Sequence, residues 1–458
     1  WNVSNVTTME EMFNNAESFN QPIGDWNVSN VTNMRMMFYA AKNFNKDISS
    51  WDVSSVNKSI LMFSLAPLFN QPIDLWNLSS LKNMGDMFSG ASSFNQPINT
   101  KIVNEGQENE YTAWDVSQVT DMSSVFTDAI SFNQDISKWN ISNVSNITSM
   151  FYGASSFNQP LNDWNVSNVA LTQLTFKNAL AFNQSVDSWD VSKVIRMNSM
   201  FSGAISFNHP LDSWNVSNVK QIVEMFNGAT LFNQNIKNWT VSNVTEFNSM
   251  FNGAKEFLDY NGLLETPDPA FWTKFTDSDL KAALDEYWPN DATEPVQSVR
   301  EKYGYIRDWD VSQVTNLQGL FKDKFNFNED ISNWDVSNVS DMRYMFDNAK
   351  SFNQPIGKWN VSNVTYMRSM FWSAKQFNQN IKDWDVSNVE VSPAGFRSMF
   401  GGASAFLNYY GVTSNDVDPA FWKRYTDSDL KAAVDEYWPT NDSTEPVQSV
   451  REKYGYMR

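Results

Sequence analysis

The apolar positions of this 458-residue chain recur with a period of 25 residues. Each copy follows roughly W-[ND]-V-S-x-V-[TS]-x-M-x-x-M-F-x-x-A-x-x-F-N-Q-x-I-x-x, so apolar and polar residues keep fixed places. A fixed period of roughly 20–50 residues is typical of a solenoid, in which each coil buries its apolar face only against its neighbours. The fourteen copies open at Trp1, Trp26, Trp51, Trp76, Trp114, Trp139, Trp164, Trp189, Trp214, Trp239, Trp309, Trp334, Trp359 and Trp384.

Residues 1–25 illustrate the secondary structure that the pattern predicts for one coil. Trp1 and Val3 alternate with polar residues, which favours a short β-strand with these two side chains facing inward. Apolar residues then recur at i, i+3, i+4 and i+7, which is one face of a short helix: Met9, Met12, Phe13 and Ala16. The pattern therefore predicts an α/β repeat solenoid with one short strand and one short helix in each coil.

An asparagine follows the second core phenylalanine in twelve of the fourteen copies. A polar residue held beside a buried ring must be hydrogen-bonded, so we expect an Asn ladder in which each amide bonds to the backbone of the next coil. The two copies without this residue have Leu258 and Leu407 instead, and both lead into long insertions. The predicted ladder comprises Asn20, Asn45, Asn70, Asn95, Asn133, Asn158, Asn183, Asn208, Asn233, Asn328, Asn353 and Asn378.

The two long insertions are near-copies of each other and share the run T-D-S-D-L-K-A-A-x-D-E-Y-W. This run predicts a capped amphipathic helix, and a second short helix is expected through Val296, Val299 and Tyr303. Asp277 and Asp279 also invite a calcium interpretation. They stand where helix-capping acids belong, however, and no D-x-D-G loop completes an EF-hand. The expected buried face of the first helix is Leu280, Ala283, Leu284 and Tyr287.

The heptad W-D-V-S-Q-V-T occurs at Trp114 and again at Trp309, which suggests modules that open with this heptad and close with a helical segment. Residues 1–113 would then be four coils from the tail of a preceding module. Residues 114–308 would hold six coils and a helical insert at about 258–308, and residues 309–458 four coils and an insert at about 407–458. Because the chain starts in mid-pattern, we expect the natural protein to extend at both ends.

Composition narrows the classes of function. The chain has 52 acidic and 33 basic residues, a net charge of −19, which disfavours nucleic acid and anionic membranes as partners. It has no cysteine, no apolar run near 18 residues and a single histidine, His209, at a position where most copies have Gln. No catalytic signature occurs. We therefore expect no enzyme activity, no catalytic residues, no cofactor, no metal site and no membrane insertion in this segment.

The run W-[ND]-V-S-x-V-T-x-M-x-x-M-F-x-x-A-x-x-F-N-Q resembles the BspA-like leucine-rich-repeat surface proteins. More narrowly, it is similar to the 25-residue "mycoplasma surface" repeats of the DUF285 type. The resemblance covers nearly the whole chain and implies a leucine-rich-repeat-like solenoid, extracellular or on a cell or virion surface. It also implies a role in adhesion or surface architecture and no common enzymatic activity.

Asn-x-Ser/Thr sequences are frequent, and in a secreted eukaryotic protein they would be N-glycosylation acceptors. A single repeat motif creates most of them at once, however, and Asp replaces the first Asn in several copies, so a polar turn is an equally direct explanation. The candidate acceptors are Asn2, Asn5, Asn27, Asn30, Asn140, Asn143, Asn165, Asn215, Asn243, Asn338, Asn360 and Asn363.

Two functions fit these observations. The first is a structural or adhesive surface protein, a segment of a longer chain that builds a filament, layer or coat through self-association or contact with other surface proteins. The alternative is an adhesin that recognises a glycan or host protein through one solenoid face. It predicts aromatic residues clustered on that face, for which the candidates are Tyr39, Tyr152, Tyr344, Tyr366 and Trp372.

Overall fold

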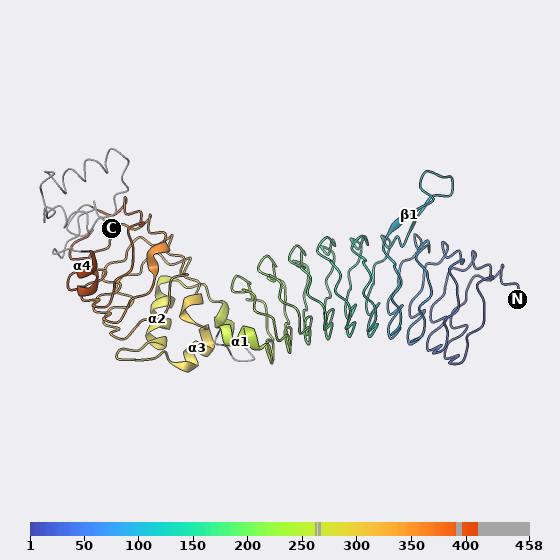
Figure 1. The fold of residues 1–458 in the computed structure, drawn as a ribbon, viewed down its shortest axis with the longest axis horizontal. Coiled ribbons are helices and arrows are strands. Elements are labelled where there is room, and N and C mark those ends of the chain that lie inside the picture. The colour runs from blue at the N-terminus through green and yellow to red at the C-terminus, as the bar shows by residue number, and fades with distance from the viewer. Residues whose placement is uncertain (262, 264–266, 391–395, 411–458) are drawn as a thin grey trace, which may run out of the picture. The chain divides into compact units, whose positions relative to one another are not determined.

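The computed structural model describes residues 1–261, 263, 267–390 and 396–410, and it divides the chain into two compact units (Figure 1). Unit 1 is residues 1–267 and unit 2 is residues 268–458. The second predicted insertion lies outside the described residues from residue 411 onward.

Unit 1 is a solenoid of ten coils stacked in register (Figure 1). We number the positions of each coil from its opening tryptophan as position 1. One isolated parallel β-bridge at position 8 joins each coil to the next, and the same bridge crosses every step of the stack. The bridged residues are Thr8, Asn33, Lys58, Asn83, Asp121, Asn146, Leu171, Arg196, Gln221 and Glu246. The predicted repeat solenoid is therefore confirmed.

The strand and helix expected in each coil are wrong. Residues 1–254, all of which the structure describes, contain no helix, and the segment of Trp1 and Val3 leads into a turn closed by Val6 N–H and Val3 O at 2.9 Å. In place of the helix, positions 9–16 form consecutive turns. The N–H groups of odd positions donate to the next coil, as Glu11 does to Arg35 O at 2.9 Å.

The even positions in this segment bond within their own coil. Met12 N–H donates to Met9 O at 3.2 Å, whereas a helix would direct every N–H to the carbonyl four residues earlier. Left-handed backbone at positions 11 and 15, with φ of 58° at both Glu11 and Asn15, produces this alternation. The spacing of apolar residues is the same in a helix and in this series of turns, so the sequence pattern could not separate them.

The core of each coil consists of aromatic columns that run through the stack. The Phe151 ring lies 5.7 Å from Phe126 in the preceding coil and 5.5 Å from Phe176 in the next, measured between centroids, and 4.1 Å from Phe157 in its own coil. The indole Nε1 of Trp164 donates to Ile136 O at 3.1 Å in the preceding coil. Both apolar and polar contacts thus join nearest neighbours.

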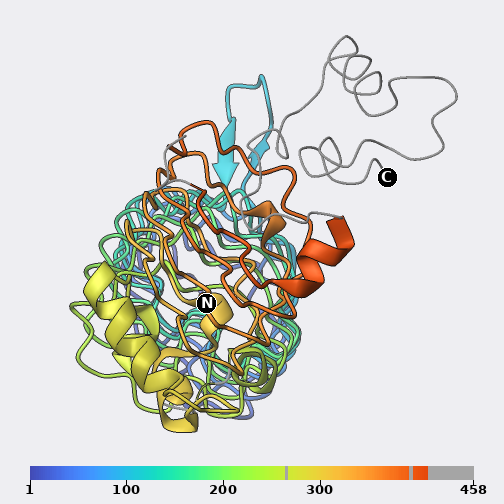
Figure 2. The same cartoon turned by 90° about the vertical axis from the view of Figure 1, so that its left-hand side faces the viewer.

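Two elements modify unit 1. Strands β1 (Lys101–Val103) and β2 (Tyr111–Ala113) form an antiparallel hairpin that stands out from the coils in Figure 1 and Figure 2. The stack continues past it, since Trp114 N–H donates to Trp76 O at 3.0 Å, so the boundary expected after residue 113 is not a break. Helix α1 (Lys255–Asn261) replaces the end of the tenth coil.

Unit 2 begins with helices and continues with coils. The order is η1 (Pro269–Trp272), α2 (Asp277–Tyr287), α3 (Gln297–Tyr303) and η2 (Ile306–Asp308), followed by the coil that opens at Trp309. A short η3 (Ile356–Lys358) lies within the coils, and α4 (Ser404–Tyr410) replaces the end of the last described coil. The N-cap of α2 is Thr276, and its buried residues are those predicted: Leu280, Ala283, Leu284 and Tyr287.

The helical segment caps the coils that follow it. Trp309 lies 4.8 Å from Phe275, and Trp288 lies 5.2 Å from Phe327, centroid to centroid. The sequence pattern assigned this helical segment to the coils before it and placed a boundary after residue 308. The structure instead divides the chain at residue 267, so the segment belongs to the coils after it. The cause is physical: an end coil exposes unpaired backbone groups and an apolar face.

The cap supplies hydrogen bonds that a preceding coil would otherwise make. Between ordinary coils, Thr32 N–H donates to Thr7 O at 2.9 Å. At the equivalent place in unit 2, Thr315 N–H donates to the carboxylate of Asp277 at 2.8 Å. Lys324, buried at a position that is Ala elsewhere, donates to Trp288 O at 2.6 Å. Side chains thus replace the missing coil.

Glu329 gives a pH-dependent test of this cap. It occupies position 21, usually Gln, and burial raises the pKa of its carboxyl above 4.5, although Arg300 and Arg307 oppose the shift. The folded state therefore favours the protonated form. The stabilising contribution of protonated Glu329 is present below about pH 4.5 and is lost as pH rises through the pKa of the folded state.

We expect Glu329→Gln to raise the melting temperature of unit 2 at pH 7, and we expect this increase in melting temperature to vanish below pH 4.5. A gain that is independent of pH would contradict this account.

Candidate functional site

The described residues hold no group of three or more Asp, Glu, His or Cys side chains able to bind a metal, and no helix among them is long and apolar enough to span a membrane. The Nε2 of His209 lies 3.0 Å from Asn183 O. Gln96 makes the same contact with Asn70 O at 3.0 Å, so His209 takes the place of a glutamine between two coils.

The twelve predicted asparagines form two rows, one in each unit. After the first asparagine of each row, the backbone N–H of every asparagine donates to the side-chain Oδ1 of its equivalent in the preceding coil, as Asn158 does to Asn133 at 2.9 Å. The adjacent glutamine usually donates to the same oxygen, as Gln159 Nε2 does to Asn133 at 3.0 Å. The row in unit 1 crosses the hairpin insertion, with Asn133 N–H 3.0 Å from Asn95 Oδ1.

Both rows end at an oxygen that has no partner among the described residues. The Oδ1 atoms of Asn233 and Asn378 are buried and accept no hydrogen bond from any residue that the structure describes. In the following coils, Leu258 lies in α1 and Leu407 lies in α4, so the chain has turned into a helix where the next donor would stand. The rows therefore have a direction, with the acceptor side at the C-terminal end.

This asymmetry provides a matched pair of variants. Asn158 Oδ1 accepts from Asn183 N–H at 2.9 Å and Gln184 Nε2 at 3.1 Å. We expect Asn158→Ala to lower the free energy of unfolding by about 1–3 kcal/mol, because the backbone N–H of Asn183 and the Nε2 of Gln184 lose their shared acceptor. Asn233→Ala removes an oxygen that has no donor and should lower it by much less. Denaturant unfolding of both variants would refute the asymmetry if the two losses were equal.

The candidate glycosylation asparagines fall into two geometric classes. At position 5, Nδ2 donates to a serine carbonyl in the preceding coil, as Asn143 does to Ser117 at 2.8 Å. At position 2, Oδ1 accepts from the serine two residues later, as Asn140 does from Ser142 at 3.1 Å. Position 5 holds Asn5, Asn30, Asn143, Asn243, Asn338 and Asn363, and position 2 holds Asn2, Asn27, Asn140, Asn165, Asn215 and Asn360.

Three of the five candidate aromatic residues come together. Tyr39 and Tyr152 lie at position 14 of well-separated coils in unit 1. Tyr344, Tyr366 and Trp372 belong to two adjacent coils of unit 2 and lie on positions 8–14, and Trp372 is 41% exposed. Unit 2 thus holds three of the five candidates in adjacent coils, whereas the two in unit 1 lie in well-separated coils.

Arginines accompany these rings at the same place in three successive coils: Arg343 and Arg368 at position 10, and the structurally equivalent Arg397, which comes four residues later in its coil. Tyr344 N–H donates to Arg368 O, and Ser369 N–H donates to Arg397 O, both at 3.0 Å, which places Arg343, Arg368 and Arg397 in one column. The Arg343 guanidinium lies 5.1 Å from the Tyr366 ring centroid, and that of Arg368 lies 5.9 Å from Tyr344. The arginine–aromatic face is Arg343, Arg368, Arg397, Tyr344, Tyr366 and Trp372.

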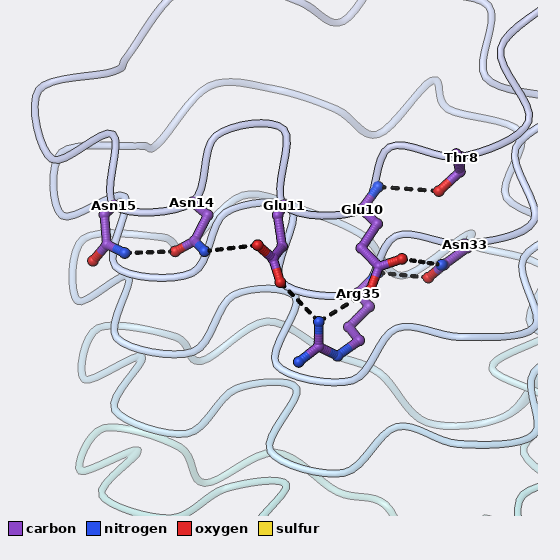
Figure 3. Close-up of polar contacts among 7 residues, drawn as sticks. All are labelled: Thr8, Glu10, Glu11, Asn14, Asn15, Asn33 and Arg35. Carbon is purple, nitrogen blue, oxygen red and sulfur yellow. Dashed lines mark hydrogen bonds and ion pairs between the residues drawn. The ribbon is translucent and has the colours of Figure 1, made fainter.

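Sequence reasoning missed this column, although aligning the copies at position 10 would have revealed it. Unit 1 has one arginine at this position, Arg35, and Figure 3 shows it between two acids. Its Nη1 lies 3.0 Å from Glu10 and 2.8 Å from Glu11, and hydrogen bonds to these carboxylates raise the pKa of Arg35. Arg35 is therefore neutralised by its own neighbours.

The charge of the arginine–aromatic face is only partly compensated. Arg343 pairs with Asp341 at 2.5 Å, and a hydrogen bond with Glu390 raises the pKa of Tyr366. Arg368 and Arg397 form no ion pair within the part of the chain that the structure describes. The face therefore combines the exposed Trp372 with two cations that have no ion pair among the described residues.

A family model described as "Mycoplasma protein of unknown function, DUF285" matches residues 1–101, 103–185, 171–262 and 291–411. No curated protein matches the chain. Among solved structures, the crystal structure of a TLR13–ssRNA13 complex is similar at 11% identity and a TM-score of 0.25, over 88% of this chain and 48% of that one. This chain thus spans about half the length of that structure, and a similarity of this level carries no argument about fold or ligand.

Proposed function

This chain belongs to the DUF285 family of repeat proteins, and from that premise we propose that it is a non-enzymatic structural protein. It is displayed extracellularly or on a cell or virion surface, and its coils are stiff segments of a filament, layer or coat. Its partners are further copies of itself or other surface proteins.

The observation that carries this proposal is the repetition of the same inter-coil bonds at successive steps of unit 1. Backbone N–H groups, tryptophan Nε1 atoms and asparagine Oδ1 atoms each form a row along the stack, as for Glu11, Trp164 and Asn158. Each added coil lengthens the stack by about 4.8 Å and repeats these bonds. Such a design favours a rod that resists bending, because a bend would stretch several rows at once.

The absence of enzyme activity belongs to the proposal and rests on how polar residues are used. The only histidine contacts an asparagine carbonyl in the neighbouring coil, and the chain has no cysteine. Polar residues at several fixed coil positions bond to the neighbouring coil, as Asn143, Asn158 and Gln159 do, which suits them to holding coils together.

Electron microscopy of the full-length protein from its native source tests the proposal. We expect filaments, sheets or a surface layer with a longitudinal repeat that matches the modules of the chain. Immunogold labelling of intact cells or virions should place the protein on the outside. Isolated particles with no ordered assembly, at the concentration found on the native surface, would contradict the structural role.

N-linked glycans are a second part of the proposal. If the protein passes through a eukaryotic secretory pathway, we expect occupancy at position 2, as at Asn140, more than at position 5, as at Asn143. The reason is that the Asn143 amide nitrogen already bonds to Ser117 O, whereas Asn140 is exposed and uses its oxygen. Glycopeptide mass spectrometry of secreted protein compares the two sites in one peptide. Higher occupancy at Asn143 would contradict the expectation.

The alternative function, an adhesin that recognises a ligand through one solenoid face, is supported by one observation. Aromatic and arginine side chains gather on adjacent coils of unit 2, where the equivalent positions of unit 1 are mostly neutral or paired. A rod with such a face would be both a structural element and an attachment surface.

A further inference from the structure

We propose that the arginine–aromatic face of unit 2 binds a linear acidic polysaccharide whose successive sugar units carry carboxylate or sulfate groups. This proposal names a ligand class for the alternative function. It is independent of whether the protein assembles into filaments, because it concerns one face of one unit.

The first argument is electrostatic. Placing like charges on adjacent coils is unfavourable, and the fold does not need arginine at position 10. The same position of unit 1 holds neutral residues in four consecutive coils, Ser123, Thr148, Gln173 and Asn198. In unit 2 the arginines recur in three consecutive coils of an otherwise acidic chain with net charge −19. A bound polyanion would offset the repulsion that this column creates.

The second argument concerns how Arg368 is held. Its Nε is buried and has no hydrogen-bond partner among the described residues, and its guanidinium lies 5.9 Å from the centroid of the Tyr344 ring. A guanidinium presents its N–H donors as a planar fork, which binds a planar or tetrahedral anion through two of them. Arg397, in the next coil, is exposed. Two donors of this kind can therefore bind successive anionic groups.

The third argument is the indole of Trp372. A Cβ at position 401 would overlap this ring, so Gly401 allows the indole to lie against the backbone of the next coil. Trp372 remains 41% exposed in that restrained position. A fixed, partly exposed aromatic ring is the usual platform for the apolar face of a pyranose, because the sugar's C–H groups contact the electron-rich face of the ring.

The spacing of the column favours a sugar chain over an acidic peptide. Core phenylalanines of these coils lie 5.4 Å apart from one coil to the next, both for Phe346 and Phe371 and for Phe371 and Phe400. A pyranose unit in a linear polysaccharide is about as long as one such step, so sugars lying along the column stay in step with the coils, and those sugars whose anionic group faces the protein meet an arginine. An extended peptide presents side chains on one face only every second residue, about 6.6 Å apart, which falls out of step.

Binding of defined polymers to the full chain tests the proposal by titration calorimetry. The probes are polygalacturonate for carboxylate, heparin for sulfate, neutral dextran, and poly-glutamate as a polyanion without sugar. We expect one or both acidic polysaccharides to bind, more weakly as salt is raised, with dextran not binding and poly-glutamate at least tenfold weaker. Which of the first two binds more tightly identifies the anionic group.

Two variants place the binding on this face. Arg368→Gln, which carries the residue found at the same position as Gln173, should weaken binding by about tenfold through loss of a charge-assisted contact. The matched control is Arg35→Gln, with the same change at the same coil position in unit 1, and it should leave binding unchanged. Trp372→Ser, which carries the residue found at Ser202, should weaken polysaccharide binding and leave any residual poly-glutamate binding unaltered.

Several outcomes would overturn the proposal. They are no binding of either acidic polysaccharide, poly-glutamate bound as tightly as both, or equal losses in Arg368→Gln and Arg35→Gln. Melting curves of each variant establish that the coils remain folded, and Tyr366→Asn, with the residue common at position 8, serves if Trp372→Ser unfolds. Failure here would leave filament assembly untouched, because assembly is read separately by microscopy of the wild-type protein.

Discussion

The rest of this structure depends on how the backbone N–H groups divide between two sets of acceptors, the carbonyls of the next coil and those of the same coil. In positions 9–16, odd residues donate to the next coil and even residues donate within their own, as Glu11 and Met12 illustrate. Because the outward bonds recur at the same positions, each side chain lies over its equivalent one coil away. Rows of Phe, Trp and Asn are therefore consequences of one backbone register. Positions 11 and 15 adopt left-handed backbone to permit it, and residues as different as Glu11 and Leu65 accept that conformation.

Because each coil contacts only its nearest neighbours, unmatched hydrogen-bonding groups occur at the ends of a stack. An interior coil has partner coils on both sides, but no coil precedes the one that opens at Trp309. The helical segment takes its place: the carboxylate of Asp277 accepts from Thr315 N–H, and Trp288 O accepts from Lys324 Nζ. At the opposite ends, α1 and α4 interrupt the repeat and leave Asn233 and Asn378 with unmatched oxygens. The helical segments thus behave as boundaries of arrays, and the raised pKa of Glu329 reflects the burial that capping imposes.

The same register determines how function can be added to such a scaffold. A side chain that recurs at one coil position becomes a column with the spacing of the coils, so a periodic surface is suited to a periodic partner. In unit 1 the asparagine row is a polar column bonded from coil to coil, as for Asn158, which suits a structural rod. In unit 2, Arg368 and Arg397 have no ion pair among the described residues, and Arg368 lies over the ring of Tyr344. The arginine column of unit 2 would by itself allow a structural rod to bind an acidic polymer as well.

The sequence by itself determined the period, the buried positions, the asparagine row and the capped helix at 277–287, because each depends on spacing that any stacked coil would preserve. It could not decide that positions 9–16 are turns, since the apolar residues Met9, Met12 and Phe13 have the same spacing in a helix. Only the tertiary structure showed where alternate N–H groups point. It also assigned the helical segment to the coils after it, because a cap is recognised by the face it covers and not by its order in the chain. The arginine–aromatic face emerged in the same way: residues 25 or 29 positions apart in the chain become neighbours once the coils stack.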